Sequence, residues 1–571
     1  MTDVPIVVGI NRTQDGSIAV ARGDSEIYSL QKERVSRRKH HWGRLGDLPD
    51  RYLPRMPLLN EPVDLVVEGY SSDDEIENLG AYHEELRRTL RLKPDAAVVL
   101  VSHHLSHLYS AFYPSPFEEA AGLVVDAQGS RVRDFTEQVD LPPGTPDGML
   151  EISSFYRCRR GLVECLAKQL WDGDWAHPAG LGCFYALLTK MLWPTGEGNE
   201  GKVMGLAPFG DPDALGLPDL DVKGHEVFIP DAWMETFGQR SETYRYAGDV
   251  PERFKRCADL AAAGQRAFEN ALTRLVDWLH AQTGLDDLVF AGGTALNCSA
   301  NGILLRESPF SEVFIPPSPH DGGTAVGCAL YGLVTCLGVE SRFRWTDDFL
   351  GPEPDPAEIE AAVRDLPDDL VAERPADLVG AMAELLERGR VVGLHQGRSE
   401  SGPRALGNRS IIADPRRPET QDYVNFEVKG REWFRPLAPL VLADHAERIF
   451  EVDRPAPFMQ YAARVRPEHR EALPGITHVD GTARLQTVTP GTTPFLHALL
   501  TRWHDRTGCP VLVNTSLNGP GDPLTESPAH SVETLRGTNM HALVMPPYLI
   551  RKREEPPVPG EDWERPPKPV V

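Results

Sequence analysis

Three histidines stand close together in one short stretch of the chain, VSHHLSHLYSA, as His103, His104 and His107. On a helix, His103 and His107 would share a face, so their imidazoles could converge on one ion, whereas His104 would point elsewhere. Asp126 closes an apolar run, and Asp321 precedes a glycine pair in PSPHDGGT. Two imidazoles and two carboxylates suit Fe(II), Mn(II) or Zn(II). The alternative is that these histidines are surface or capping residues, because the H-x-x-x-H spacing is common.

A second group of residues is suited to a nucleotide. Lys202 is a cation in a glycine-bounded turn (EGKVMGLA), and Gly292 and Gly293 follow an apolar run and precede Asn297. Because glycine lacks a Cβ, backbone amides at such a pair can approach a phosphate closely. Taken alone, a glycine pair could equally serve only to turn the chain.

A basic segment near the beginning of the chain, KERVSRRKHH, contains Arg37, Lys39 and His40. Charge runs of this kind are usually solvated loops. A role for Lys39 in a cleft is the other interpretation.

Cations also gather in the last third of the chain. Arginine forks and a lysine point charge are what a site for polyanions needs, although individual members could form surface salt bridges with neighbouring acids. The candidates are Arg404 and Arg409 in GPRALGNRS, Lys429, Arg431 and Arg435 in VKGREWFRP, Arg484 in TARLQTV, and Asn514, Thr515 and Ser516 at the end of CPVLVNTS.

Apolar runs predict the elements that must position these residues. Strands are expected at 5–10, 63–68 and 96–102 and in the segments 121–129 and 288–297, the first in a hairpin with the following SIAV, and a helix is expected at 254–284. Strand, glycine turn and helix recur in both halves of the first 345 residues, which predicts two α/β lobes around a nucleotide cleft. Residues 346–357 read as a linker, 358–552 as a second α/β domain, and 553–571 as an ill-ordered tail rich in proline and charge.

Composition narrows the function classes. The chain of 571 residues carries a formal net charge of −25, which disfavours a large nucleic acid as partner. Its eight cysteines form no C-x-x-C pair and are expected to be reduced thiols. The N-terminus does not read as a signal peptide, and no apolar run approaches the ~20 residues of a membrane helix. A cytoplasmic protein without a membrane partner is the expectation.

Ordered motifs make the interpretation specific. HHLSHLYSAFY with VVDAQG, GKVMGLAPFG, AGGTALNCSANG, GPRALGNRSI, VKGREWFRPLAP, ARLQTV and LVNTSLN follow one another along the chain. Together they resemble the carbamoyltransferases of antibiotic and nodulation-factor biosynthesis, from about residue 5 to about residue 552. The first domain also resembles the catalytic subunit of the tRNA threonylcarbamoyl-adenosine machinery, and the second its YrdC-like partner.

The resemblance implies a fold and a reaction. The fold would be an actin/Hsp70/sugar-kinase-like (ASKHA) two-lobed domain followed by a YrdC-like α/β domain. The second domain would form carbamoyl-adenylate from carbamoyl phosphate and ATP with Mg²⁺, and the first would pass the carbamoyl group to a hydroxylated small-molecule acceptor. A homodimer is compatible with the family. The rival functions are a tRNA threonylcarbamoyl transferase and a non-catalytic, actin-like ATP sensor.

The resemblance also implies residue roles. It assigns iron to His103, His107, Asp126 and Asp321, the adenylate to Lys202, Gly292, Gly293 and Asn297, and carbamoyl phosphate to Arg404, Lys429 and Arg484. The triphosphate of ATP is expected at the main-chain amides and hydroxyls of Asn514, Thr515 and Ser516.

One position departs from the family. Where relatives carry a His-Asp pair, as in H-D-A-S-A, this chain has TQDGSI, so Gln14 replaces the histidine while Asp15 and Ser17 remain. Glutamine cannot take a proton near neutral pH. Either Gln14 reports a different acceptor, or another group has taken over the chemistry. We favour acceptor recognition, with Asp15, Lys39 and His40 as the candidate catalytic groups nearest in sequence.

Overall fold

The computed structural model describes residues 4–70, 78–194, 198–239, 244–246 and 250–566. It divides into two compact units, one of Met1–Ser36 and His40–Trp345, the other of Arg37–Lys39 and Thr346–Val571. The division after Trp345 coincides with the boundary drawn from the sequence. The grouping of Arg37–Lys39 with the second unit was not anticipated.

The first sheet of the first unit has the strand order β3-β2-β1-β4-β5. Its first strand, IVVGIN, is buried along its whole length, as expected of an apolar run that is covered on both faces. β1 pairs antiparallel with β2, in the predicted hairpin, and parallel with β4. The strands are β1 (Ile6–Asn11), β2 (Ser17–Arg22), β3 (Glu26–Gln31), β4 (Pro62–Tyr70) and β5 (Arg91–Ser102).

The second sheet repeats this pattern in the order β12-β11-β6-β7-β8. β6 pairs antiparallel with β7 and parallel with β11, so it occupies the place that β1 has in the first sheet. This repetition agrees with the two α/β lobes expected from the sequence. The strands are β6 (Glu119–Val125), β7 (Leu150–Arg159), β8 (Leu162–Trp171), β11 (Asp287–Ala291) and β12 (Glu312–Phe314), while β9 (Asp221–Lys223) and β10 (Glu226–Phe228) form a separate hairpin.

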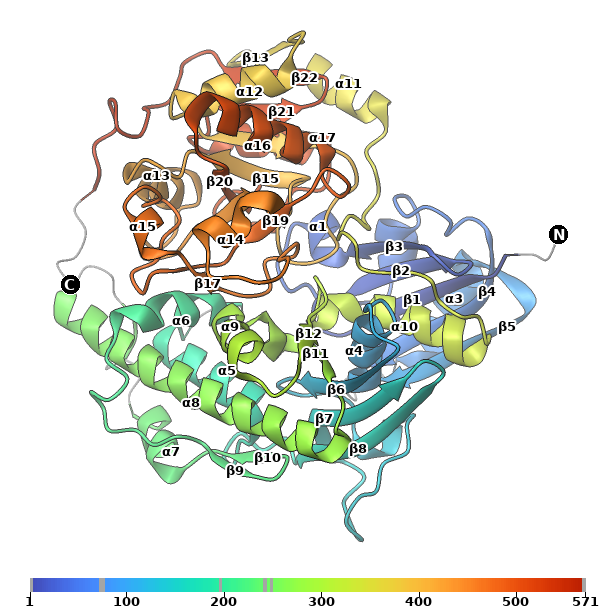
Figure 1. Ribbon diagram of the computed structural model, residues 1–571. Helices are drawn as coiled ribbons and strands as arrows, with labels where there is room; N and C mark the ends of the chain where they lie inside the picture. Colours follow the sequence, from blue (N-terminus) through green and yellow to red (C-terminus); the bar gives the residue numbers. More distant parts are fainter. Residues whose placement is uncertain (1–3, 71–77, 195–197, 240–243, 247–249, 567–571) are drawn as a thin grey trace. The chain divides into compact units, whose positions relative to one another are not determined.

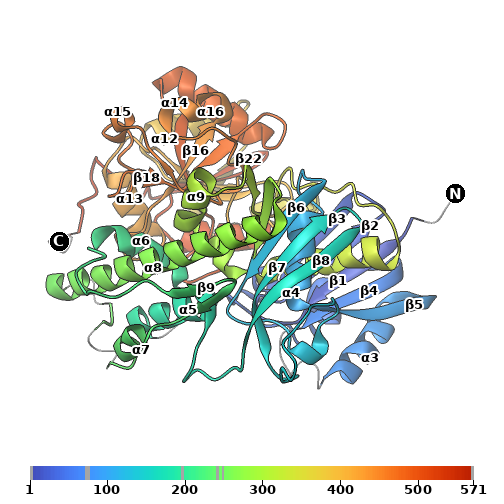
Figure 2. The same cartoon turned by 60° about the horizontal axis from the view of Figure 1, so that its bottom comes forward.

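Two helices, α4 and α10, lie between these sheets (Figures 1 and 2). They cross so closely that a Cβ on Gly327 of α10 would lie 1.7 Å from the carbonyl oxygen of Ser106 in α4. Only glycine permits this approach. The helices of the unit are α1 (Lys32–Ser36), α3 (Leu79–Thr89), α4 (His103–Phe112), α5 (Gly180–Leu192), α6 (Glu200–Leu206), α7 (Asp231–Phe237), α8 (Pro251–Thr283), α9 (Cys298–Glu307) and α10 (Thr324–Tyr331).

The second unit is built on an eight-stranded sheet of order β13-β22-β21-β14-β15-β20-β16-β19. Alternate residues of β20 enter two separate cores: Val511 and Val513 pack on one side, Leu512 on the other. The larger strands are β13 (Leu370–Glu373), β14 (Val392–His395), β15 (Arg409–Ala413), β16 (Ala438–Leu442), β19 (Gln486–Val488), β20 (Val511–Ser516), β21 (Ala542–Met545) and β22 (Tyr548–Lys552), with β17 (Ala463–Arg464) and β18 (Thr482–Ala483) paired apart.

Helices cover both faces of this sheet. α12 and α16 pack together over the core that contains Leu512, and α17 packs against β14 and β21. The helices are α11 (Pro356–Arg364), α12 (Leu378–Glu387), α13 (Glu419–Tyr423), α14 (Ala446–Ile449), α15 (Pro467–Arg470), α16 (Pro494–Thr507) and α17 (Pro528–Gly537).

Two segments are better anchored than the sequence suggested. In the expected linker, Asp348 is buried and its carboxylate accepts the N–H of Gly402 at 2.7 Å. In the tail, Trp563 packs against Tyr423 and donates to Glu427 at 3.0 Å. Trp563 and the buried Val558 thus attach this part of the tail to the second unit, while residues 567–571 lie outside the described part.

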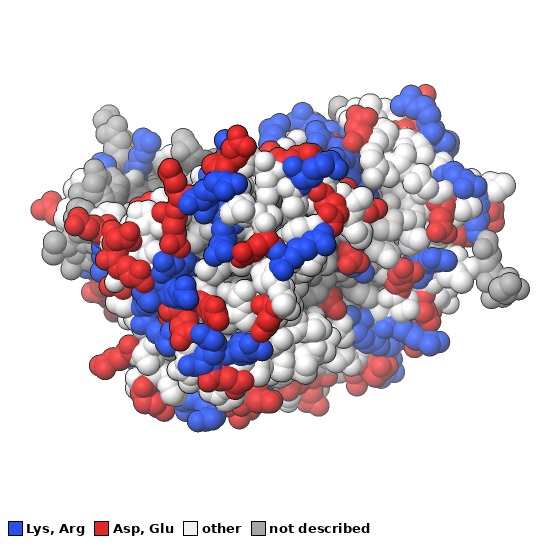
Figure 3. Space-filling view, turned by 90° about the horizontal axis from the view of Figure 1, so that it is seen from above, with Lys and Arg blue, Asp and Glu red and all other residues white. Residues whose placement is uncertain are grey.

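On the face drawn in Figure 3, cationic and anionic side chains are intermingled. None of the helices in the described part is both long and apolar enough to cross a membrane.

Candidate functional site

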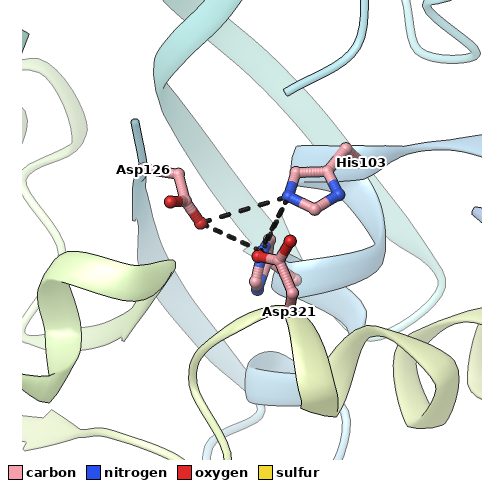
Figure 4. A group of neighbouring side chains, drawn as sticks. His103, Asp126 and Asp321 are labelled. Carbon is pink, nitrogen blue, oxygen red and sulfur yellow. Dashed lines mark hydrogen bonds and ion pairs between the residues drawn. The ribbon is translucent and has the colours of Figure 1, made fainter. Parts of the chain in front are cut away.

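The four residues predicted to share an ion come together in the first unit (Figure 4). The Nε2 atoms of His103 and His107 lie 3.1 Å apart on successive turns of α4. Asp321 Oδ1 is 3.4 Å and 3.5 Å from these two nitrogens, and Asp126 Oδ2 is 3.3 Å from that of His107. One ligand atom from each residue falls within 4.8 Å of all the others. Both histidines are buried, and the carboxylates are slightly exposed.

The geometry and the charge of this tetrad fit a divalent cation. Two nitrogens bound at ~2.1 Å to one ion lie about 3 Å apart when their bonds are near a right angle. Burial lowers the pKa of His107, but hydrogen bonds and charge from Asp126 and Asp321 outweigh it and raise that pKa to about 9. Burial likewise raises the pKa of Asp321, yet His103 and His107 hold it well below its ordinary value. The tetrad therefore stabilises positive charge at its centre.

Asp126 is held in place by the glycine pair. It follows β6, and its Oδ2 accepts the N–H of Gly293 at 2.9 Å. Gly292 has φ +95°, and a Cβ there would lie 2.2 Å from the carbonyl oxygen of Val125. The N–H of Gly292 donates to the Pro319 carbonyl at 2.9 Å. Both amides thus have protein partners, and the pair's evident role is to position a carboxylate; nucleotide binding by these glycines stays a prediction.

Asp321 is oriented by the first loop of the chain. Thr13 Oγ1 donates to Asp321 Oδ2 at 3.1 Å, and Asn11 Nδ2 donates to the backbone carbonyl of Asp321 at 3.0 Å. Thr13 could not be predicted from the sequence, because a threonine 308 residues away from its partner leaves no local signal. Gln14 lies in the same loop, and its backbone carbonyl accepts from Asn11 at 3.1 Å.

Asp15 and His40 form an ion pair in the first unit. Their Oδ1 and Nδ1 atoms are 2.9 Å apart, and both residues have left-handed backbones, with φ of +54° and +52°. Burial lowers the pKa of His40, but the Asp15 carboxylate raises it to about 9. At neutral pH His40 is an imidazolium, which donates hydrogen bonds and carries charge. This protonation state argues against His40 as a base, although its catalytic role is otherwise a prediction.

The remaining residues assigned to the adenylate have local partners. Lys202, in α6, places its Nζ 5.6 Å from the ring centroid of Trp193. Asn297 caps α9 by accepting the N–H of Ala300 at 3.1 Å, and its amide also bonds with Gln265. These contacts explain a structural use of Asn297 and leave its nucleotide role as a prediction.

In the second unit, Lys429 is buried among polar acceptors. Its Nζ donates to the carbonyl and hydroxyl oxygens of Ser516 at 2.6 Å and 3.0 Å, and to both oxygens of Asn518. Burial lowers the pKa of Lys429 well below its ordinary value, and the nearby charges of Arg431 and Lys39 lower it further. Lys429, Arg431 and Lys39 thus form a cationic cluster, although Lys39 was expected in the first domain.

Arginines surround the same region. Burial lowers the pKa of Arg431 well below its ordinary value, as does Arg435, while Glu432 opposes the shift. The positive charge of Arg484 also lowers the pKa of both Arg431 and Arg435. Within the described residues, Nη2 of Arg431 and Nε of Arg484 are buried and make no hydrogen bond. A polyanion would relieve both the mutual repulsion and the unmet donors.

The loop that carries Arg404 is fixed by a carboxylate. Oε1 of the buried Glu400 accepts the N–H groups of Leu406 and Asn408 at 2.8 Å and 2.9 Å. Arg409 is also fully buried, and its Nη1 donates to the Gln396 carbonyl at 2.7 Å. The alternative of a surface salt bridge for Arg409 was wrong, because its guanidinium joins main-chain segments inside the unit.

The three residues predicted to hold ATP differ in their surroundings. Asn514 is buried, and its Nδ2 donates to the Ala405 carbonyl and to Gln486 Oε1 at 2.8 Å and 2.9 Å. Thr515 and Ser516 are half-buried, and Ser516 contacts Lys429. Asn514 therefore braces the loop beside Arg404, and Ser516 lies in the cationic cluster. ATP binding by all three stays a prediction.

Comparisons with known proteins cover most of the chain. The family model described as "Carbamoyltransferase N-terminus" matches residues 73–330, and "Carbamoyltransferase C-terminus" matches residues 383–552. Nodulation protein NolO of Bradyrhizobium diazoefficiens is 34% identical over 473 residues, which cover 81% of this chain and 80% of NolO. The 3'-hydroxymethylcephem-O-carbamoyltransferase of Streptomyces clavuligerus is 30% identical over 542 residues, covering 90% of this chain and 93% of that enzyme.

Among solved structures, HypF of T. kodakarensis aligns with a TM-score of 0.39 and 14% identity, over 59% of this chain and 48% of HypF. That similarity is too low to establish a common fold.

Proposed function

The chain belongs to the carbamoyltransferase family of enzymes, and from this premise we propose that it is an ATP-dependent O-carbamoyltransferase that uses carbamoyl phosphate. The observation that carries the proposal is the buried tetrad of His103, His107, Asp126 and Asp321 in one unit, accompanied by the cationic cluster around Lys429 in the other. We assign the first unit to the actin/Hsp70/sugar-kinase (ASKHA) class, because its two sheets repeat one strand order. The second unit is assigned as YrdC-like.

The second unit would make carbamoyl-adenylate. Carbamoyl phosphate and ATP repel each other strongly, and Arg404, Lys429 and Arg484 would bind carbamoyl phosphate and offset that repulsion. Water would attack the phosphorus of carbamoyl phosphate, and the P–O bond to the carbamoyl group would break to give phosphate and carbamate. A carbamate oxygen would then attack the α-phosphorus of ATP, and pyrophosphate would depart with its bond electrons. Hydroxyl and amide groups of Thr515 and Ser516, together with Mg²⁺, would hold the triphosphate.

The first unit would transfer the carbamoyl group to a hydroxyl. His103, His107, Asp126 and Asp321 would hold a divalent ion, for which Fe(II) is our assignment, and such an ion when bound supplies Lewis-acid stabilisation of the charge that develops in acyl transfer. The acceptor oxygen would form a bond to the carbamoyl carbon and release its proton to solvent, while the C–O bond to the adenylate phosphate breaks and AMP leaves with its electrons. The imidazolium of His40 and the ammonium of Lys202 would neutralise the adenylate phosphate.

The acceptor class follows from the relatives. The Streptomyces enzyme is named for the hydroxymethyl group of a cephem, which is a hydroxylated natural product. We propose that this chain also acts on a hydroxyl of a small natural product, and that Gln14, in the loop that orients Asp321, contributes to the choice of acceptor.

The full chain, ATP, Mg²⁺ and carbamoyl phosphate test the proposal. We expect AMP and pyrophosphate to be released only when carbamoyl phosphate is present, and a screen of hydroxylated natural products to yield a mass gain of one carbamoyl group. Release of neither product would favour an ATP sensor, and retention of tRNA with threonine-dependent turnover would favour the tRNA-modifying rival.

A further inference from the structure

Helix α4, which carries both histidines of the tetrad, begins without the usual cap. Ser102 occupies the N-cap position, but its side chain accepts no hydrogen bond from the helix. Its hydroxyl instead donates to Glu137 and lies 3.1 Å from the hydroxyl of Thr136. The first amides of a helix need acceptors when they are buried. Another group must therefore provide them.

Two residues far away in sequence supply these acceptors. Ser130 Oγ accepts the N–H of His103 at 2.9 Å, and Glu151 Oε1 accepts the N–H of His104 at 3.0 Å. The same oxygen of Glu151 accepts the N–H of Ser130 at 3.0 Å, which joins the two halves of the cap. All of these groups are buried.

A fully buried lysine holds the capping carboxylate. Lys168, on β8, donates to Glu151 Oε2 and to Ser154 Oγ, and lies 2.7 Å from Glu137. Neither Lys168 nor Glu151 has any exposed side-chain surface. With both carboxylates ionised, the Glu137–Lys168–Glu151 triad has a formal charge of −1. The negative charge of the triad lies at the N-terminus of α4, which is the positive end of the helix dipole. It therefore offsets the unfavourable effect of that dipole on a cation bound by His103.

The next residue of β7 holds a third member of the tetrad. The N–H of Asp126 donates to the carbonyl of Ile152 at 3.0 Å. Residues 151 and 152 therefore brace the helix that carries His103 and His107 and, separately, the backbone of Asp126. An error in their placement would displace three of the four proposed ligands together.

We propose that Glu151, anchored by Lys168, is a positioning residue for the metal centre: it caps α4 and fixes the histidines against Asp126 and Asp321. This inference rests on the proposed function in that it requires the tetrad to bind a divalent ion. Glu151 is not one of the four proposed ligands, so its loss should weaken metal binding while every ligand remains. Substitution of residues that orient metal ligands typically weakens metal affinity about 10–100-fold.

Glu151→Gln is the most informative substitution. Glutamine is nearly isosteric and can still accept the N–H of His104 through its amide oxygen, but it loses the charge that opposes the helix dipole. Lys168 keeps Glu137 as an ionic partner at 2.7 Å, so no buried charge is left unpaired. Glu164→Gln is the matched control, because Glu164 lies on the same sheet in an exposed pair with Arg157 at 3.1 Å.

The test titrates the full-length protein with Fe(II) under anaerobic conditions and with Co(II), whose absorption spectrum reports ligand geometry. We expect Glu151→Gln to raise the Kd about 10–100-fold and to alter the Co(II) spectrum, whereas Glu164→Gln matches the wild type. Pyrophosphate release driven by carbamoyl phosphate should be unchanged in both. A folded Glu151→Gln protein with the wild-type Kd and spectrum would overturn the positioning role.

Two further outcomes are decisive. If Glu151→Gln does not fold, Ser130→Ala removes only the His103 half of the cap, and an unchanged Kd in that variant would refute the inference. If the wild type itself binds neither ion, the metal centre fails, and the positioning role fails with it. That result is distinguishable from a failure of positioning alone, in which the wild type binds normally.

Discussion

Binding of a phosphate ligand to the second unit should be accompanied by uptake of a proton at Lys429. Burial and the charges of Arg431, Lys39 and Arg435 hold the pKa of Lys429 well below its ordinary value, so the free protein binds a proton at this nitrogen less tightly than an exposed lysine does. A bound dianion favours the ammonium and raises that pKa. Protons taken up on binding must, by linkage, make affinity fall as pH rises between the free and the bound pKa.

The size of the effect follows from the same linkage. One proton taken up corresponds to about 1.4 kcal/mol per pH unit, which is roughly a tenfold rise in Kd for each unit. Isothermal titration calorimetry with carbamoyl phosphate, and with inorganic phosphate as a stable probe, would count the protons from the observed enthalpy in buffers of different ionisation enthalpy. Measurements of Kd at several pH values below the ordinary pKa of lysine give the slope independently.

Substitutions distinguish proton uptake at Lys429 from a change in the protonation of the ligand itself. Lys429→Met should remove the uptake and raise the Kd about 10–100-fold, because a hydrogen bond to a charged group contributes about 1.5–3 kcal/mol. Lys429→Arg should retain a permanent charge and also show no uptake. The exposed Lys190 of the first unit offers a control, Lys190→Met, that should behave as the wild type. An uptake that persists unchanged in Lys429→Met would refute the argument.

The remaining predictions concern both units. His107→Ala should empty the metal site, as measured by metal analysis, and abolish carbamoyl transfer while leaving pyrophosphate release intact; equal loss of both activities in a folded protein would contradict two separate sites. Arg484→Ala should slow adenylate formation about 10–100-fold, and added carbamoyl-adenylate should bypass the defect. Gln14→His should change acceptor preference or acceptor KM with no change in adenylate formation. The Asp15 partner raises the pKa of His40 to about 9. The ion pair therefore stabilises the folded state fully below the ordinary histidine pKa near 6.5, and this stabilisation is lost as pH rises through 9. His40→Gln should lower Tm at neutral pH but not in strongly alkaline buffer.

The tetrad could be predicted from the sequence because each member has a local signature. His103 and His107 are one helical turn apart, Asp126 ends an apolar strand, and Asp321 begins a helix after a turn. Asp126 and Asp321 follow β6 and β12, which run in the same direction in one sheet and therefore end at the same edge, whereas the histidines follow β5 of the other sheet. Thr13 and Glu151 had no comparable signature, since each reaches its partner through the tertiary fold.

The roles of the individual cationic residues in the second unit were harder to predict from the sequence. Their concentration in the second unit was visible in the motifs, but burial decides what each one does. Arg409 and Arg431 look alike in the sequence. In the structure Arg409 donates to the main-chain carbonyl of Gln396, whereas Arg431 donates to the side chain of Asn425 and lies near the charges of Arg435 and Arg484. The placement of Lys39 in the second unit also depended on where a short loop folds, which no periodicity specifies.

The structure bears on the two interpretations of Gln14. If the histidine of relatives were a base, this chain would need a substitute, and His40 and Asp15 were the nearest in sequence. His40 is an imidazolium at neutral pH, because Asp15 raises its pKa to about 9, so it has no lone pair to accept a proton. One carboxylate oxygen of Asp15 in turn accepts a hydrogen bond from that imidazolium at 2.9 Å. Since the pair is arranged to carry charge and to donate a hydrogen bond, the loss of the histidine is better explained by a change of acceptor contact than by a transfer of its proton-accepting role to these neighbours.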